Sequence, residues 1–304
     1  MTNVTVCADD FGLTSGISSG ILTCLERRRI SATSCMTARA TWLDRVAELR
    51  PFAGIADIGL HFTLTDLEPI GAAPILAPHG RFPPLSHVLR LSLIRRLPQD
   101  EIREQLARQL DAFEREFGSP PAHLDGHHHV HQLPGVRKIV VEVLRHRYPT
   151  DPPYVRVSHD VIRRVWHRGI DFRKCLMIGA FGRALRKVAA RSGITTNEGF
   201  SGIYDFNKER LDLTVLFDRF LQCPGSRMLI MCHPGCSDLE LRRIDSLTNQ
   251  RNAELAFLLS DEWPQLLVKH RLQLGGLRRL GEHLSSNSRR SNPISIVQRP
   301  RRPA

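Results

Sequence analysis

The sequence predicts an α/β protein built on a parallel sheet that is either open or closed into a barrel. Short apolar runs alternate along the chain with amphipathic stretches of helical period, a pattern typical of repeated strand–helix units. Polar motifs directly follow four of these apolar runs. Because the carboxyl ends of parallel strands build the functional site in such folds, we expect these motifs to meet on one face.

The first third of the chain contains three expected strands. A helix should follow the first of them, because Thr14 or Ser15 can cap a stretch that carries Ile17, Ile21 and Leu25 on one face. The expected strands cover residues 4–8, 31–36 and 55–64, and a second helix covers residues 41–50. A stretch rich in proline and glycine, residues 68–98, then predicts a long loop that could form a lid or a substrate wall.

The clearest helix begins near Asp100, where apolar residues recur every three or four positions up to Phe117. Gly118 and Pro120 should end it. After Pro121 the expected elements are a short strand, a helix within residues 135–148, a strand at 154–157, a helix at 181–193, a strand at 228–232, a helix at 253–260 and a strand at 272–274.

The net charge of +12 raises the question of an anionic partner. The segment 285–304 holds five arginines and no acid, so we expect a folded domain over residues 1–284 and a basic disordered tail over 285–304. A second basic stretch, residues 163–191, fits a solvated helix face, a surface that meets anionic lipid, or a nucleic-acid patch. We favour the first interpretation, leave peripheral lipid contact open, and expect no nucleic-acid partner because no RNA- or DNA-binding motif occurs.

No run of about 18 apolar residues occurs, so no membrane-spanning helix is expected. The first ten residues have neither a basic nor an apolar signal region, which predicts a cytoplasmic protein. The seven cysteines are odd in number and scattered, which favours reduced thiols over a disulfide framework. The motif CHPGC at residues 232–236 lacks a second pair at zinc-finger spacing, so we do not expect a metal knuckle there.

The four motifs carry carboxylates and imidazoles. ADDFG (residues 8–12) places Asp9 and Asp10 at the end of a strand, where one can bind a metal while the other faces a reacting water; an Asp-rich turn is the alternative. His61, in GLH, follows an apolar run and taken alone is more often a core histidine than a ligand. His233, in MCHPG, is either a general acid or the cap of a turn before Pro234, and the sequence favours neither.

HLDGHHHVH (residues 123–131) concentrates five histidines in nine positions. On an extended backbone Asp125, His127, His129 and His131 would share one face and His128 would point away. Burying these rings without partners is costly, and a metal ion would remove that cost by taking a lone pair. The resulting nitrogen and oxygen donor set suits Zn²⁺, Mg²⁺, Mn²⁺ or Fe²⁺, and a free carboxylate beside it suits hydrolysis of an amide or ester.

In order and spacing, ADDFG, GLHFTLT, HLDGHHHVH and MCHPG resemble the YdjC-like family of carbohydrate deacetylases, from Val4 to about Leu274. The resemblance implies a parallel (β/α) barrel-like fold of the glycoside hydrolase and deacetylase type, with about seven strands. It also implies metal-dependent removal of acetyl groups from N-acetylated amino sugars, within carbohydrate metabolism. Family members act on chito-oligosaccharides or on lipid-linked N-acetylglucosamine, and DGHHHVH is nearer the first type.

By the same resemblance, Asp10, His61 and His127 bind a divalent metal, with Mg²⁺ expected and Zn²⁺ as the alternative. Asp9 corresponds to the base that activates water, and His233 lies in the active-site cleft. No organic cofactor is expected, and a homodimer is implied because family members often dimerise.

These assignments give a mechanistic hypothesis. The acetamide carbonyl binds the metal, Asp9 deprotonates the attacking water, and His233, His129 or His131 protonates the leaving amine. Asp125 is expected to orient the ligands. The rivals are another metallohydrolase, acting on a glycolipid amide, a cyclic amide or a phosphoester, and a basic nucleic-acid-binding protein whose histidines are incidental.

Overall fold

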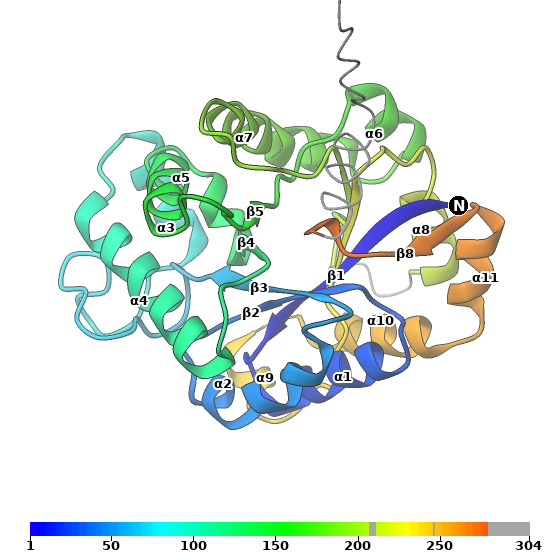
Figure 1. Cartoon of the computed structure of the whole chain (residues 1–304), viewed down its shortest axis with the longest axis horizontal. Coiled ribbons are helices and arrows are strands. Elements are labelled where there is room, and N and C mark those ends of the chain that lie inside the picture. The colour runs from blue at the N-terminus through cyan, green and yellow to red at the C-terminus, as the bar shows by residue number, and fades with distance from the viewer. Residues whose placement is uncertain (207–210, 246, 279–304) are drawn as a thin grey trace, which may run out of the picture.

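A parallel sheet that curls into an incomplete barrel forms the centre of the molecule (Figure 1). The computed structural model describes residues 1–206, 211–245 and 247–278. Within these ranges the strands are β1 (Thr2–Phe11), β2 (Ala32–Cys35), β3 (Asp57–Phe62), β4 (His123–Gly126), β5 (Tyr154–Val155), β6 (Gly199–Ser201), β7 (Met228–Cys232) and β8 (Leu272–Leu274). Every pairing between them is parallel, so the predicted parallel barrel-like fold is confirmed.

The strand order is β5-β4-β3-β2-β1-β7-β6, and β8 pairs separately with the start of β1. Seven strands therefore follow one another across the curl, as predicted, although the sequence did not indicate β6. β1 is central and is buried from Val4 to Phe11. Burial on both faces is what a parallel sheet covered by helices requires, and it explains why the core strands are apolar runs without strict alternation.

The two edges of the curled sheet meet at a seam formed by residues 155–157 and 195–197. Val155 and Thr196 form an isolated parallel bridge. The side chain of Asn197 adds two bonds, because its carbonyl accepts from the Val157 N–H at 2.7 Å and its amide donates to the Val157 carbonyl at 2.9 Å. Asn197 is fully buried, so a side-chain amide substitutes here for a missing ladder pair.

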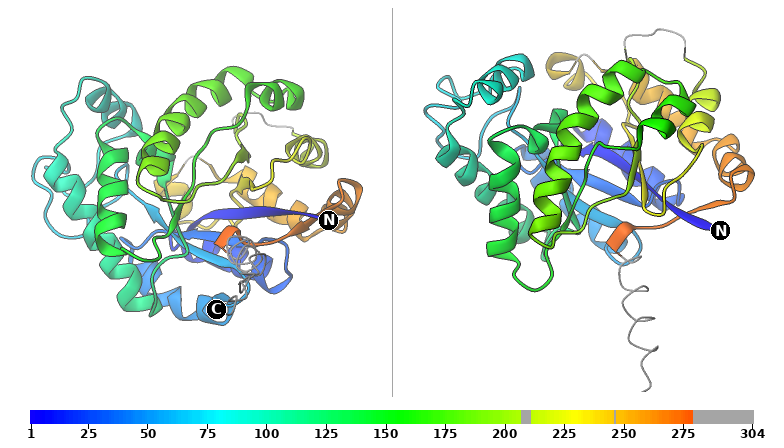
Figure 2. Two further views of the ribbon diagram at one scale, coloured as in Figure 1. Left: turned by 45° about the horizontal axis from the view of Figure 1, so that its top comes forward. Right: turned by 90° about the horizontal axis from the view of Figure 1, so that it is seen from above.

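Helices surround the sheet on its outer side (Figures 1 and 2). They are α1 (Ser15–Glu26), α2 (Ala40–Arg45), α3 (Leu85–Leu93), α4 (Gln99–Phe117), α5 (Val136–Arg147), α6 (Ile162–Arg168), α7 (Phe172–Arg191), α8 (Leu213–Phe220), α9 (Leu241–Ile244), α10 (Asn249–Leu259) and α11 (Glu262–Lys269), with 3₁₀ turns η1 (Val46–Phe52) and η2 (His127–Gln132). Helix packs on helix in the series α4, α5, α7 and α6, and α1 packs on α10.

The two best-defined helices of the sequence are confirmed. Thr14 caps α1 by accepting a hydrogen bond from the Ile17 N–H, and the predicted apolar face of this helix is buried. α4 begins at Gln99 and ends at Phe117, where Gly118 adopts the left-handed conformation (φ 92°). Glycine is suited to that position because it has no Cβ to clash with the preceding turn.

Other expectations need correction. The stretch 68–98 is not a loop throughout, because α3 forms inside it and buries Val88 against the core. The helix expected at 41–50 changes to 3₁₀ geometry at Val46, ahead of Pro51, which cannot continue an α-helical ladder. α7 begins at Phe172, well before the expected start.

The remaining differences are omissions. α6, α8 and α11 were not predicted, because seven- and eight-residue helices carry too few turns for a clear periodic signal. The basic tail expected at 285–304 lies outside the residues that the structure describes.

Candidate functional site

The two adjacent aspartates sit at an irregularity near the carboxyl end of β1. The pairing of β1 with β2 shifts register between Ala8 and Phe11, and Asp10 has φ 75°. A regular strand would point neighbouring side chains to opposite faces. The left-handed turn at Asp10 instead lets both carboxylates lie beside His61. The two aspartates therefore form a bulge near the end of β1 and not a regular stretch of strand.

Asp10, His61 and His127 form one compact group. Asp10 Oδ1 lies 3.3 Å from His61 Nε2 and 3.3 Å from His127 Nδ1. One donor atom from each of the three residues lies within 4.8 Å of the others. The three residues span 117 positions of the sequence, from Asp10 to His127, and three strand ends, those of β1, β3 and β4, bring them together as predicted.

The donor set fits a divalent cation. Asp10 Oδ1 is buried and has no hydrogen-bond partner among the described residues, although it faces two imidazole nitrogens. Such an unpartnered acceptor is costly unless a cation or a proton takes its lone pair. One carboxylate and two imidazoles in reach of one point are ligands that several divalent metals accept.

Asp125 orients His61 within this group. Its Oδ1 lies 2.6 Å from His61 Nδ1, on the opposite side of the ring from Asp10. A carboxylate behind a histidine fixes the ring tautomer and leaves Nε2 free to bind a metal. Asp125 is in turn held by Ser34, whose hydroxyl donates to Oδ2, and by Arg156 at 3.0 Å.

The pKa values of this group reflect its charges. Burial acts to raise the pKa of Asp10, but Arg251 and the two histidines outweigh it and hold that pKa well below its usual value. Burial acts to lower the pKa of His61, yet Asp125 and Asp9 raise it to about 10. Without a cation, His61 therefore holds a proton where a metal ligand needs a lone pair. A metal would have to displace that proton.

Asp9 does not belong to the same group but lies next to it. Both of its carboxylate oxygens accept from Arg156, at 2.6 and 2.8 Å. Arg156 is fully buried and comes from the segment that follows β5. Arg156 was not predicted as a site residue, although its position between two valines in YVRV was a usable signal, since a charged residue in an apolar run requires a buried partner.

His233 completes the polar cluster, so all four motifs meet at one end of the sheet. Its Nε2 lies 4.0 Å from Asp9 Oδ2, and its ring packs edge-on against Phe206. Burial, together with Arg251 and Arg156, outweighs the pull of the aspartates and lowers the pKa of His233 to about 4. The ring is therefore neutral at pH 7.

Two charged residues of α10, neither of them predicted from the sequence, support this end of the sheet. Glu254 accepts from the His233 backbone N–H at 2.6 Å and from the Tyr204 hydroxyl at 2.6 Å. Arg251 donates to Asp10 Oδ2 at 2.6 Å. Both are 1% exposed, whereas charged positions in a helix are normally expected to face solvent.

The remaining histidines of the cluster do not share one face, so the extended alternation expected for them is wrong. β4 ends at Gly126, and His128 and His129 then adopt φ values of 52° and 58°. The chain consequently turns. His129 Nδ1 pairs with the Ser158 hydroxyl at 3.1 Å, and His131 is fully buried with Nε2 bonded to the Arg156 carbonyl.

His128, expected to point away, lies beside Thr65, with Nδ1 3.0 Å from the hydroxyl oxygen. It is the one exposed histidine of residues 123–131.

A second group of possible ligands is Cys7, His123 and Asp125, all fully buried. Arg156 already lies 3.0 Å from the Asp125 carboxylate, so a positive charge occupies the place that a cation would need. The cysteines of CHPGC join no candidate metal group among the described residues. All seven cysteines are free.

No helix within the described residues is long and apolar enough to cross a membrane.

Comparisons with known proteins identify the family. The family model described as YdjC-like protein matches residues 3–269. A chitooligosaccharide deacetylase of Klebsiella pneumoniae (strain 342) is 31% identical over 240 residues, covering 77% of this chain and 81% of the relative. A chitooligosaccharide deacetylase of Proteus mirabilis (strain HI4320) is 28% identical over 273 residues, covering 89% of this chain and 95% of the relative.

A solved structure supports the fold. The crystal structure of an Enterococcus faecalis V583 protein, provisionally named for cellobiose-phosphate cleavage, superposes with a TM-score of 0.66 over 92% of this chain and 98% of that one. At 22% identity this likeness concerns the fold alone. Because the family model covers most of the chain and a relative is 31% identical over 77% of it, the chain belongs to the YdjC-like family.

Proposed function

We propose that this protein is a metal-dependent deacetylase of N-acetylated amino sugars. The observation that carries the proposal is the group of buried Asp10 and His61 with half-buried His127, with the Asp9 carboxylate next to it. Membership of the YdjC-like family and the names of the relatives, which are chitooligosaccharide deacetylases, support the substrate class. A chito-oligosaccharide is our first candidate substrate, and an N-acetylglucosaminyl conjugate is the second.

In this proposal Asp10, His61 and His127 hold the cation. A bound divalent metal supplies Lewis acidity, which polarises the acetamide carbonyl and makes a water molecule more acidic. Mg²⁺ is our first candidate because of the family resemblance. Zn²⁺ is the alternative, and the two imidazole donors are ligands that it favours.

Asp9 is proposed as the general base. Arg156 binds both of its oxygens and so fixes the carboxylate in one orientation next to the metal ligands. The base removes a proton from the attacking water as the bond to the acetyl carbon forms. The carbon–nitrogen bond then breaks, and acetate and the free amine are the products.

His233 is our candidate for protonating the leaving amine. It is neutral at pH 7 because its pKa is about 4, and it lies 4.0 Å from Asp9. It is therefore placed to take up the proton that Asp9 removes and to deliver it to the amine. His131 is less suited, since its Nε2 is committed to the Arg156 carbonyl in the interior.

The cellular compartment and the oligomeric state are also proposals. We propose a cytoplasmic location, which the seven free cysteines support because reducing compartments preserve thiols. We also propose a homodimer, on the family resemblance alone. Sedimentation equilibrium of the full chain tests the second of these statements.

The decisive experiment measures acetate release. The purified full chain is incubated with N-acetylglucosamine oligomers and with a lipid-linked N-acetylglucosamine, after chelation and after addition of Mg²⁺ or Zn²⁺. The proposal expects acetate only with added metal. Release of phosphate from phosphoesters in a parallel assay, with no acetate, would favour the other metallohydrolase function instead.

A further inference from the structure

The outer surface of α6 and α7 exposes large apolar side chains. Trp166 is 71% exposed, Ile162 60%, Met177 59% and Val161 50%. Soluble proteins commonly expose single apolar residues, but four large exposed apolar side chains, at the start of α6, within it and on the contacting helix α7, indicate an interaction surface. We call the surface formed by these four residues, Arg163 and Arg173 the α6–α7 face.

The same surface carries a surplus of positive charge. Residues 161–191 contain nine arginines and lysines and a single acid, Asp171. Arg163 and Arg173 are exposed and form no salt bridge among the described residues. The sequence alone favoured a solvated helix face for this stretch. A solvated face would not need four exposed apolar residues between its cations.

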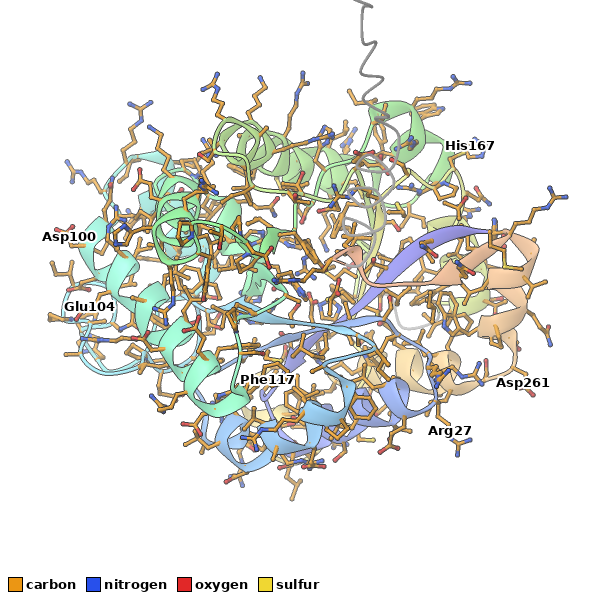
Figure 3. All side chains as sticks on the ribbon, viewed as in Figure 1. Arg27, Asp100, Glu104, Phe117, His167 and Asp261 are labelled. Atoms are coloured by element: carbon orange, nitrogen blue, oxygen red, sulfur yellow. The ribbon has the colours of Figure 1, made fainter. Side chains whose placement is uncertain are left out.

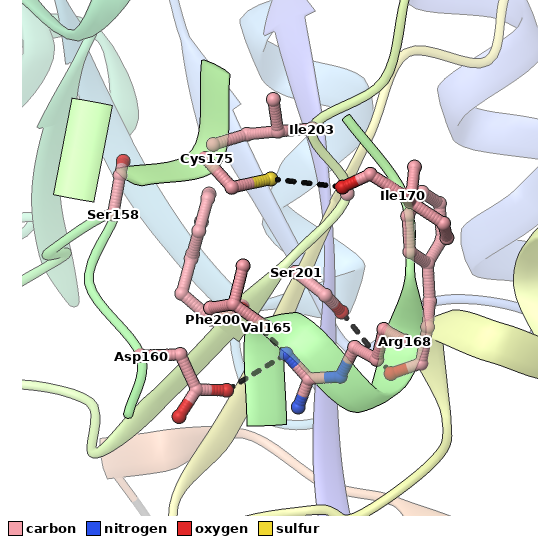
Figure 4. A pocket seen from close by; sticks show the side chains of 11 residues that line it. Ser158, Asp160, Val165, Arg168, Ile170, Cys175, Phe200, Ser201 and Ile203 are labelled. Carbon is pink, nitrogen blue, oxygen red and sulfur yellow. Dashed lines mark hydrogen bonds and ion pairs between the residues drawn. The ribbon is translucent and has the colours of Figure 1, made fainter. Parts of the chain in front are cut away.

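Contacts of buried Arg168 and of the Trp166 ring fix the position of the α6–α7 face. Arg168 of α6 is 5% exposed and binds Asp160 at 2.7 Å and the Phe200 carbonyl at 3.0 Å, in the small pocket of Figure 4. The Trp166 ring packs edge-on against Phe172, with centroids 5.3 Å apart. The exposed residues therefore belong to a fixed surface and not to a frayed end.

We propose that the α6–α7 face docks on the surface of an anionic membrane. Apolar side chains on a basic helical surface enter the boundary between headgroups and acyl chains, while arginines meet the negative headgroups. Trp166 suits this depth because tryptophan has an apolar body and a polar N–H, and it concentrates at membrane interfaces. The proposal does not depend on the deacetylase activity.

Other occupants fit less well. In a two-fold dimer formed through this face, the arginines of one copy would meet those of the other, and Asp171 alone could offset them. A nucleic acid would pair with the cations, but Val161, Ile162 and Met177 have no rings on which bases could stack. An anionic lipid surface matches both the charge and the aliphatic side chains.

Docking here would bring the candidate site close to the bilayer. On its inner side α7 packs so tightly against the segment after β5 that a Cβ at Gly182 would lie 2.9 Å from the Ser158 nitrogen. The Ser158 hydroxyl pairs with His129 of the histidine cluster. Lys174 of α7 donates to the Tyr204 carbonyl at 3.0 Å, next to Phe206, which packs on His233.

Tryptophan fluorescence provides a direct test. The chain has three tryptophans, and Trp42 and Trp263 are fully buried, so Trp166 alone reports on solvent. The full chain is titrated with vesicles of phosphatidylcholine and with vesicles containing phosphatidylglycerol. With the anionic vesicles the emission should shift to the blue, and acrylamide quenching of the exposed tryptophan should fall several-fold. Neutral vesicles should produce neither change.

Matched variants separate this face from the basic tail, which is present in all of them. Arg163→Gln with Arg173→Gln should weaken partitioning about 30-fold, since each cation near an anionic surface contributes about fivefold. Arg27→Gln with Arg28→Gln removes the same charge from a different side of the molecule (Figure 3) and should change partitioning less than about twofold. Trp166→Phe should abolish the fluorescence changes.

Three results would overturn the proposal. The first is cosedimentation with anionic vesicles while Trp166 stays fully open to acrylamide. The second is protection of Trp166 by single-stranded RNA and not by vesicles. The third is a concentration-dependent dimer that protects Trp166 without lipid.

Discussion

Arg156 and Asp9 form a two-point ion pair in the interior, with nitrogen–oxygen distances of 2.6 and 2.8 Å. The planar guanidinium matches both carboxylate oxygens at once, which a lysine ammonium cannot do. The pair therefore fixes the rotation of the carboxylate that we propose as the base. It also places a charge beside Asp125, the residue behind His61.

Replacing Arg156 by lysine should keep the positive charge but should no longer fix the orientation of the Asp9 carboxylate. We expect kcat to fall about 100-fold, because a displacement of about 1 Å at a reacting group has that effect. KM and metal affinity should change much less. Steady-state kinetics and calorimetric metal titration measure these quantities, and Arg164→Lys, at a partly exposed pair with Asp160, is the matched control. An unchanged kcat would show that the pair serves only the fold.

Replacing Asp9 by asparagine should remove the base and leave the metal. General base catalysis contributes about 10²- to 10⁴-fold, so acetate release should fall by that factor. The affinity for Mg²⁺ or Zn²⁺ should stay close to that of the wild type, whereas His127→Ala should lose it. Near-normal acetate release from the Asp9→Asn protein contradicts the assignment.

Replacing Asp125 by asparagine should weaken metal binding. Loss of a carboxylate behind a histidine ligand typically reduces metal affinity about 10- to 100-fold. Titration calorimetry gives the value, and activity should recover in part at high metal concentration. Asp57→Asn is the control for a general effect of removing a buried carboxylate. Asp57 is buried on the same strand as His61 but lies at the opposite end of β3. Equal affinities in the two variants would argue against Asp125 as a support for His61.

The buried, neutral His131 should make the protein sensitive to acid. Burial lowers its pKa to about 4, while the unfolded chain has a pKa of about 6.5. As pH falls below about 6.5, the unfolded state takes up the proton first, so stability is complete above that pH and is lost towards pH 4.

Between pH 7 and pH 5 this effect amounts to about 2 kcal/mol in the free energy of unfolding. The glutamine in His131→Gln can still donate to the Arg156 carbonyl but cannot titrate. The free energy of unfolding of this variant should therefore fall by about 2 kcal/mol less than that of the wild type over this interval. Urea denaturation at the two pH values measures the difference. Parallel losses in both proteins would mean that other groups dominate the acid response.

The features that could be predicted from the sequence are those that depend on local patterns of apolar and polar residues. β1, β3 and β7 are apolar runs, and the placement of Asp10, His61 and His233 near their carboxyl ends follows from parallel topology. The structure confirms that these side chains meet, while their chemical roles remain predictions. α4 could be predicted equally well from the sequence, because its apolar period extends over several turns.

What the sequence could not show depends on tertiary burial. Arg251 and Glu254 are charged residues of a helix, and only the packing of α10 against the end of the sheet turns them inwards. The turn at His128 and His129 needs positive φ at two non-glycine residues, which residue alternation cannot reveal. The exposed position of Trp166 likewise appears only when α6 and α7 are in place.

The seam of the curled sheet has a consequence for how activity is lost. Arg156 lies between Val155, which bridges to Thr196, and Val157, whose backbone is held by Asn197. The group that fixes Asp9 on the central strand is thus anchored at the seam, where one bridge and the Asn197 side chain join the two edges of the sheet. Because Val155, Arg156 and Val157 are all fully buried, opening the seam would expose the core at the same time as it frees Asp9, so denaturant should end turnover and unfold the core in one step.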